Sequence, residues 1–167
     1  TFMPNYRRYY ISSVPVFVTV VTKNRSPWLI DCVDQLLASM REAKNKYSYR
    51  HIAHVVMDDH FHWLFEMENE NNFSKLVTFV KRDVILRLKE EGINAQWQNR
   101  FYDHVIRDQQ DLDRHIDYVH FNPVKHGAVL KASEYSHSSF NEWRERGRYD
   151  ENWGETEPGG IKLMSLE

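Results

Sequence analysis

Two strand-forming runs that are joined by only two residues constrain the fold of this chain most strongly. Residues 50–57 (RHIAHVVM) and 60–67 (HFHWLFEM) are both rich in β-branched or aromatic residues, and only Asp58 and Asp59 separate them. So short a connection between extended segments requires that the two strands pair antiparallel, as a hairpin. The chain is therefore expected to contain an antiparallel sheet.

The segments around this hairpin predict the remaining elements in a definite order. The run VPVFVTVVT at 14–22 predicts a strand before it, and FYDHVIRD at 101–108 predicts a short strand after it. Apolar residues at helical spacing predict helices near 31–46 and from 73 to Gly92. The resulting order, β-α-β-β-α-β, is the ferredoxin-like α+β pattern, in which two helices cover one face of an antiparallel sheet.

An additional helix is predicted from Asp108 onward by the apolar stripe of Leu112, Ile116 and Val119. We expect this helix to end at Pro123, because proline disfavours helical geometry in the residue before it.

Polar side chains occupy one flank of this last helix, beside its apolar stripe. They are Asp111, His115, Tyr118 and Asn122. Tyr118 and Asn122 are four residues apart, so their side chains can face a common point. A purely structural interpretation is also open, because Asn before Pro is common at helix ends and a half-buried tyrosine often only packs.

The second strand of the hairpin carries two histidines, His60 and His62. Since side chains alternate along a strand, both point to the face opposite the bulky residues Phe61, Trp63, Phe65 and Met67. The bulky set is expected to pack against the helices, which leaves the histidines on the open face. Two imidazoles at this spacing can bind one divalent ion, but ordinary surface histidines would give the same pattern. For His51 and His54, on the partner strand, we expect ordinary surface histidines.

Composition limits the class of protein only broadly. A chain of 167 residues with 41% hydrophobic and 28% charged residues is expected to form one globular domain. Five acidic residues follow Tyr149 against the single base Lys162, so we expect a domain over 1–149 and a flexible acidic tail over 150–167. The domain is then slightly basic, which permits DNA binding without arguing for it. A lone Cys32 and the lack of a long apolar run predict a cytoplasmic protein without membrane association.

Four motifs in one order resemble a known family. They are NYRRYY at 5–10, HFH at 60–62, WQNRFYDHVIRD at 97–108 and DYVHFNPVKHG at 117–127. Together they resemble the REP-associated tyrosine transposases, a branch of the HUH superfamily of single-stranded-DNA nucleases, and the similarity extends from residue 5 to residue 145. The resemblance implies the same ferredoxin-like domain with a helix that carries the catalytic tyrosine.

The resemblance also implies a site and its chemistry. Tyr118 corresponds to the nucleophile, and His60, His62 and Asn122 correspond to the ligands of Mg²⁺ or Mn²⁺. Such an ion would polarise the scissile phosphate and neutralise charge in the transition state. Attack by the tyrosine would give a 5′-phosphotyrosine and a free 3′-OH, so that strands can be rejoined without ATP.

Family members recognise repetitive extragenic palindromes, which are short imperfect DNA hairpins beside a tetranucleotide. The candidate phosphate or base contacts are Arg7, Arg8, Arg100, Arg107 and Lys125. The candidate rings for stacking on unpaired bases are Tyr6, Tyr9, Tyr10, Trp97 and Phe101. For several of them a structural role is open: Arg107 could form only a salt bridge, and Trp97 and Phe101 could be core residues.

Two other functions compete with a transposase. A hairpin-DNA-binding module without turnover would keep the DNA partner and lose catalysis. A metallohydrolase of small molecules would use the histidine pair with a water nucleophile, and would not need Tyr118. The sequence leaves the oligomeric state open between a monomer and a homodimer.

Overall fold

A sheet of four antiparallel strands lies at the centre of the structure. The computed structural model describes residues 13–69 and 72–166. The sheet has the order β2-β3-β1-β4, with β1 (Pro15–Val21), β2 (Tyr49–Val56), β3 (His60–Met67) and β4 (Tyr102–Val105). All pairings are antiparallel, and β2 and β3 form the hairpin predicted from the two-residue connection. The predicted ferredoxin-like α+β class is therefore confirmed.

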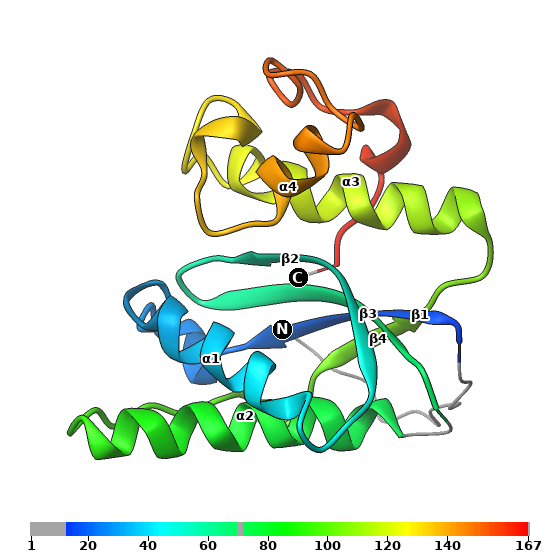
Figure 1. The fold of residues 1–167 in the computed structure, drawn as a ribbon. Helices are drawn as coiled ribbons and strands as arrows, with labels where there is room; N and C mark the ends of the chain where they lie inside the picture. Colours follow the sequence, from blue (N-terminus) through cyan, green and yellow to red (C-terminus); the bar gives the residue numbers. More distant parts are fainter. Residues whose placement is uncertain (1–12, 70–71, 167) are drawn as a thin grey trace.

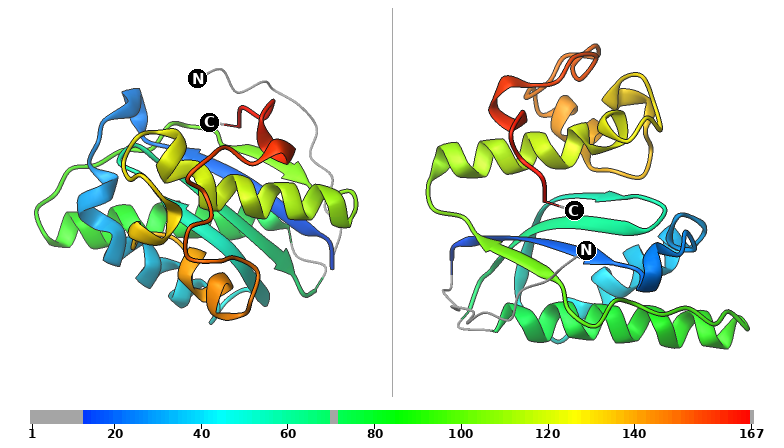
Figure 2. Two further views of the ribbon diagram at one scale, coloured as in Figure 1. Left: turned by 90° about the horizontal axis from the view of Figure 1, so that it is seen from above. Right: turned by 180° about the vertical axis from the view of Figure 1, so that it is seen from behind.

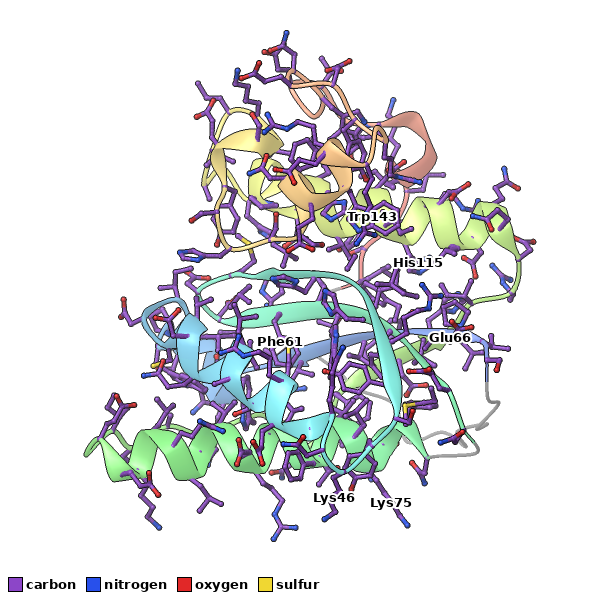
Figure 3. The ribbon with its side chains drawn as sticks, viewed as in Figure 1. Lys46, Phe61, Glu66, Lys75, His115 and Trp143 are labelled. Carbon is purple, nitrogen blue, oxygen red and sulfur yellow. The ribbon has the colours of Figure 1, made fainter. Side chains whose placement is uncertain are left out.

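Two helices, α1 (Val33–Ala43) and α2 (Phe73–Glu90), cover one face of this sheet (Figure 1). The alternation along β3 directs Phe61, Trp63 and Phe65 into this layer, where each side chain is 0% exposed. Burial of a large apolar side chain contributes about 1.5–3 kcal/mol, so these three rings hold the helices on the sheet. Figure 3 shows Phe61 between the sheet and α1.

The third long helix, α3 (Gln109–Lys125), lies across the opposite face of the sheet (Figures 1 and 2). Its Ile116 and Val119 belong to one buried cluster with Phe17 and Leu64 of the strands. The expectation of an open face for the histidine pair was therefore wrong. This face carries apolar residues of its own, and covering them with α3 also buries the polar residues between them.

The end of α3 also differs from the prediction. The helix continues through Pro123 to Lys125, so a stop at the proline was wrong. Pro123 lies in the last turn, where its missing N–H removes only one bond within the helix. The Asn122 carbonyl still accepts from the His126 N–H at 3.0 Å, so Asn122 keeps its helical position.

The remaining helical segments are short. They are α4 (Phe140–Glu145) and the 3-10 turns η1 (Lys23–Arg25), η2 (Leu29–Cys32), η3 (Ala132–Glu134) and η4 (Gly159–Ile161). Within the described ranges, no helix has the length and apolar character to cross a membrane.

Residues after α3 fold back over that helix (Figure 2). Trp143 of α4 donates from Nε1 to the Ile52 carbonyl of β2 at 2.9 Å, and Tyr149 packs against Trp153 with ring centroids 4.4 Å apart. Ile161, in the segment expected to be a flexible tail, is only 3% exposed. Trp153 and Ile161 of this segment thus pack against the cluster around α3, while the domain boundary at 149 and the flexibility of the tail stay predictions.

Candidate active site

The two histidines of β3 lie under α3. His60 is 2% exposed and His62 is 0% exposed, and their ring centroids are 4.8 Å apart. In the sheet register His62 lies opposite Thr19 of β1, and His60 lies opposite Val21. Both rings therefore point from the same side of one strand into the space between the sheet and α3.

Each of these histidines has a polar partner at Nδ1. His60 Nδ1 is 2.7 Å from Oδ1 of Asp59, and His62 Nδ1 is 2.8 Å from Oγ1 of Thr19. The hydrogen bond from His60 holds the pKa of the Asp59 carboxyl below its usual value. Arg25 also lies near this carboxylate, with Nη1 3.6 Å from Oδ2.

Asn122 meets the histidine pair from α3. Its Oδ1 lies 3.2 Å from Nε2 of His60, and its side chain is 0% exposed. These two atoms come from residues that are 62 positions apart in the chain. The structure therefore brings together the three residues that the sequence analysis predicted as metal ligands.

Tyr118 lies beside the same histidines, one helical turn before Asn122. Its ring makes an edge contact with His62 at 5.4 Å between centroids. Its hydroxyl accepts hydrogen bonds from Nζ of Lys125 at 3.2 Å and from the N–H of Leu166 at 3.0 Å. The Lys125 ammonium also lies 4.9 Å from the centre of the tyrosine ring. A cation is thus positioned where negative charge on the phenol oxygen would be stabilised.

The C-terminal segment covers this tyrosine. Tyr118 is 1% exposed, and Leu166 reaches it through its main chain. The Leu166 carbonyl in turn accepts from the Thr19 hydroxyl at 2.6 Å. We did not predict this contact from the sequence, because main-chain groups of a Gly-rich, acidic segment carry no residue-type signal for docking.

The other predicted DNA contacts lie in three different environments. Arg100 and Lys125 are exposed, and Arg107 is 72% exposed with a long ion pair of 3.7 Å to Asp111. Trp97 and Phe101 instead belong to the core under α2, where Trp97 Nε1 donates to the Lys81 carbonyl at 2.9 Å. Rings packed in this way have no free face for a base. The predicted contacts Tyr6, Arg7, Arg8, Tyr9 and Tyr10 lie outside the described residues.

His51 and His54 are not the ordinary surface histidines that we expected. They are half-buried between β2 and the segment that contains α4, and their rings meet at 3.2 Å between Nε2 of His51 and Nδ1 of His54. Trp63 Nε1 donates to His51 Nδ1 at 3.0 Å. Burial lowers the pKa of His51 to about 4 and that of His54 to about 3. The pair is therefore neutral and structural, because α4 covers this part of β2.

A second polar cluster, which we did not predict, joins β4 to the start of α3. His104 Nε2 lies 2.7 Å from Oδ2 of Asp111, and His115 Nδ1 lies 3.2 Å from Oδ1 of the same carboxylate. Burial acts to raise the pKa of Asp111, but the hydrogen bonds from His104 and from the Arg107 N–H outweigh this effect. The pKa of the Asp111 carboxyl is therefore lower than its ordinary value. These three groups could also hold a metal ion. Figure 3 shows His115 on the side of α3 that faces the sheet.

Comparison with known proteins identifies the class to which this fold and site belong. The family "Transposase IS200 like" matches residues 6–122, which is more than half of the chain. The chain therefore belongs to the IS200-like transposase family.

Particular relatives narrow this assignment. An Escherichia coli K12 protein named "REP-associated tyrosine transposase" is 33% identical over 153 residues, which cover 90% of this chain and 91% of the relative. A Haemophilus influenzae protein whose name refers to the same group is 32% identical over 165 residues, covering 91% and 94%. The resemblance to REP-associated tyrosine transposases is thus confirmed, and the general role that these matches support is that of a DNA transposase.

A solved structure agrees with the sequence relatives. The structure of a REP-associated tyrosine transposase bound to a REP hairpin superposes with a TM-score of 0.82 at 31% identity, and the match covers 95% of this chain and 96% of the other. The fold is therefore shared over nearly the whole length. The IS200-like family also implies a divalent metal ion in the active site.

Proposed function

We propose that this protein is a metal-dependent DNA endonuclease and strand transferase that cleaves and rejoins single-stranded DNA beside palindromic hairpins. The observation that carries the proposal is the meeting of Tyr118 with His60, His62 and Asn122 in one buried space, at an edge contact of 5.4 Å between Tyr118 and His62. A nucleophile and a set of metal-ligand atoms from β3 and α3 are the two parts that phosphodiester transfer requires.

The residues present fit a bound Mg²⁺ or Mn²⁺. Neighbouring ligands of an octahedral ion with bonds near 2.1 Å lie about 3.0 Å apart, and His60 Nε2 and Asn122 Oδ1 are 3.2 Å apart. Both atoms are hydrogen-bond acceptors when His60 is neutral, so a positive group between them is favourable. His60, His62 and Asn122 would hold the ion, which would supply Lewis-acid polarisation of the scissile phosphate.

The chain's own residues account for the bond changes. The phenol oxygen of Tyr118 attacks phosphorus, the bond from phosphorus to the 3′-oxygen breaks, and the departing oxygen takes up a proton to become a 3′-OH. The phenol proton passes to water, and water supplies the proton that the 3′-oxygen takes up, so the protons balance. The Lys125 ammonium, 3.2 Å from the phenol oxygen, stabilises the negative charge that this oxygen carries before it attacks. Reverse attack by a 3′-OH rejoins the strand, because the phosphodiester energy is kept in the phosphotyrosine.

The proposed partner is a DNA hairpin with single-stranded flanks. The similar transposase was solved with a REP hairpin, and here Arg100, Arg107 and Lys125 offer exposed cations for phosphate contacts. His62 and Tyr118 meet within one chain, which supports a site that is complete in a monomer.

A covalent adduct assay tests the proposal. The protein is incubated with Mn²⁺ and an oligonucleotide that carries a hairpin, single-stranded flanks and a label at its 3′ end. A labelled adduct that survives denaturing electrophoresis is expected, and Tyr118→Phe should abolish it while hairpin affinity in fluorescence anisotropy is retained. Tyr49→Phe is a matched control, because its hydroxyl donates to the Met40 carbonyl at 2.6 Å in the core on the other face of the sheet.

The two competing functions give different outcomes in the same assay. A binding module without turnover gives no adduct with the unaltered protein on any hairpin that it binds. A metallohydrolase with a water nucleophile keeps its activity in Tyr118→Phe. Either outcome would refute the proposed function.

A further inference from the structure

Each metal-ligand histidine proposed above has a hydrogen-bond partner at Nδ1, on the side of the ring away from Nε2. These partners are Thr19 on β1 and Asp59 in the β2–β3 turn. We infer that Thr19 and Asp59 are positioning residues, which keep both histidines in the tautomer that directs Nε2 toward the metal. The inference rests on the proposed function and extends it to the partners that orient the ligands.

The hydrogen bonds of Thr19 determine the tautomer of His62. The Thr19 hydroxyl has one hydrogen, and it donates this hydrogen to the Leu166 carbonyl at 2.6 Å. The same oxygen lies 2.8 Å from His62 Nδ1, so it must accept there. His62 Nδ1 therefore carries the hydrogen, and Nε2 carries the lone pair of the neutral ring.

Asp59 acts on His60 in the same way. A carboxylate is only an acceptor, so at 2.7 Å it receives the hydrogen of His60 Nδ1. The lone pair of His60 Nε2 then points toward Asn122 Oδ1, 3.2 Å away. A carboxylate behind a metal-bound histidine both orients the ring and raises its basicity.

The geometry also restricts rotation of both rings. His60 and His62 are 2% and 0% exposed. Their partners are fixed by the sheet, since Thr19 lies on β1 and Asp59 lies in the turn between β2 and β3. Phe17 stacks on the His62 ring at 5.2 Å between centroids. The rings are therefore oriented before an ion arrives, which lowers the entropy lost on binding.

Metal affinity tests the inference without reference to activity. Loss of such an outer partner lowers metal affinity by about 10–100-fold, so Thr19→Val and Asp59→Ala should each weaken Mn²⁺ binding by about 10-fold or more in titration calorimetry of the full chain. Thr19→Ser keeps the hydroxyl and should restore the affinity. Asp58→Ala is the matched control, since Asp58 is an exposed carboxylate in the same turn.

A spectroscopic readout separates positioning from general destabilisation. Nitrogen-15 chemical shifts of the metal-free protein should report hydrogen at Nδ1 of His62, and a mixture of tautomers in Thr19→Val. Thr19→Val also releases the Leu166 carbonyl, which would ease access of the ion and tighten binding. Weaker Mn²⁺ binding by Thr19→Val would therefore indicate the loss of a positioning contact, because an opened site would bind the ion more tightly.

The possible failures are distinguishable. If His62→Ala abolishes Mn²⁺ binding while Thr19→Val and Asp59→Ala bind as tightly as the unaltered chain, the positioning inference is overturned and the proposed function stands. If His62→Ala also binds Mn²⁺ normally, the metal centre of the proposed function fails as well.

Discussion

Mild acid should destabilise this protein through three neutral histidines, two half-buried and one buried, that lie between β2, α3 and the α4 segment. They are His51, His54 and His120. Burial lowers the pKa of His51 to about 4 and that of His54 to about 3, and it lowers the pKa of His120 well below its ordinary value. Neighbouring basic residues act in the same direction: Lys44 and Arg146 at His51, His51 and His137 at His54, and His54, Arg148 and His51 at His120.

The sign and size of the effect follow from proton linkage. In the unfolded chain these histidines bind protons below a pH of about 6.5, whereas in the folded chain they do not until the pH approaches 4. Their contribution is therefore complete above pH 6.5, decreases progressively as the pH falls below that value, and is fully lost once the pH has passed the folded pKa values. Each histidine adds a slope of about 1.4 kcal/mol per pH unit, or about 4 kcal/mol per unit for the group. A typical stability of about 5–15 kcal/mol would be largely lost within this range.

Urea denaturation of the metal-free protein between pH 7.5 and 4.5 measures this slope. His54→Asn keeps a hydrogen-bonding atom near the position of Nδ1 and cannot be protonated, so it should reduce the slope by about 1.4 kcal/mol per pH unit. Val84→Ala, on the buried face of α2, should lower the midpoint equally at every pH and keep the slope. A midpoint that does not change across this range would refute the reasoning. The carboxyls of Asp59 and Asp111 cannot mimic the effect. Their pKa values are lowered in the folded chain, so the stability that they contribute is lost only below pH 3.8.

Three other outcomes are expected. Removal of residues 163–167 deletes the Leu166 N–H and carbonyl from Tyr118 and Thr19. At saturating Mn²⁺, where weaker metal binding has no effect, adduct formation should therefore accelerate, and an unchanged rate would show that the segment does not restrict the nucleophile. Tyr149→Phe removes a hydroxyl that joins His120 Nδ1 and Asp117 Oδ1, both at 2.9 Å, and should cost about 1–3 kcal/mol in urea denaturation with no change in the adduct yield. Phe101→Ala should cost about 3–5 kcal/mol of stability, as for a core residue. Arg100→Ala should leave the melting temperature unchanged, and it should reduce the salt dependence of hairpin binding by about one counterion. If Phe101→Ala weakened hairpin binding at unchanged stability, its placement in the core would be contradicted.

Local patterns in the sequence were sufficient for the four strands, for the three long helices and for the side chains that these elements carry. The two-residue link at Asp58 and Asp59 allowed only a hairpin, and alternation along 60–67 separated the histidines from the bulky rings. Helical spacing placed Tyr118 and Asn122 on one flank. Each of these inferences depends on neighbours within about eight residues, where backbone geometry alone relates side chains.

Only the tertiary structure decided what those side chains meet. The 3.2 Å approach of His60 to Asn122, the burial of the histidine face and the contact of Leu166 with Tyr118 all depend on how α3 and the C-terminal segment dock on the sheet. Trp97 and Phe101 show the same limit, because an aromatic residue in a sequence is equally suited to stacking on a base and to packing in a core. Docking is determined by the sum of many apolar contacts between distant segments, and no local pattern reports that sum.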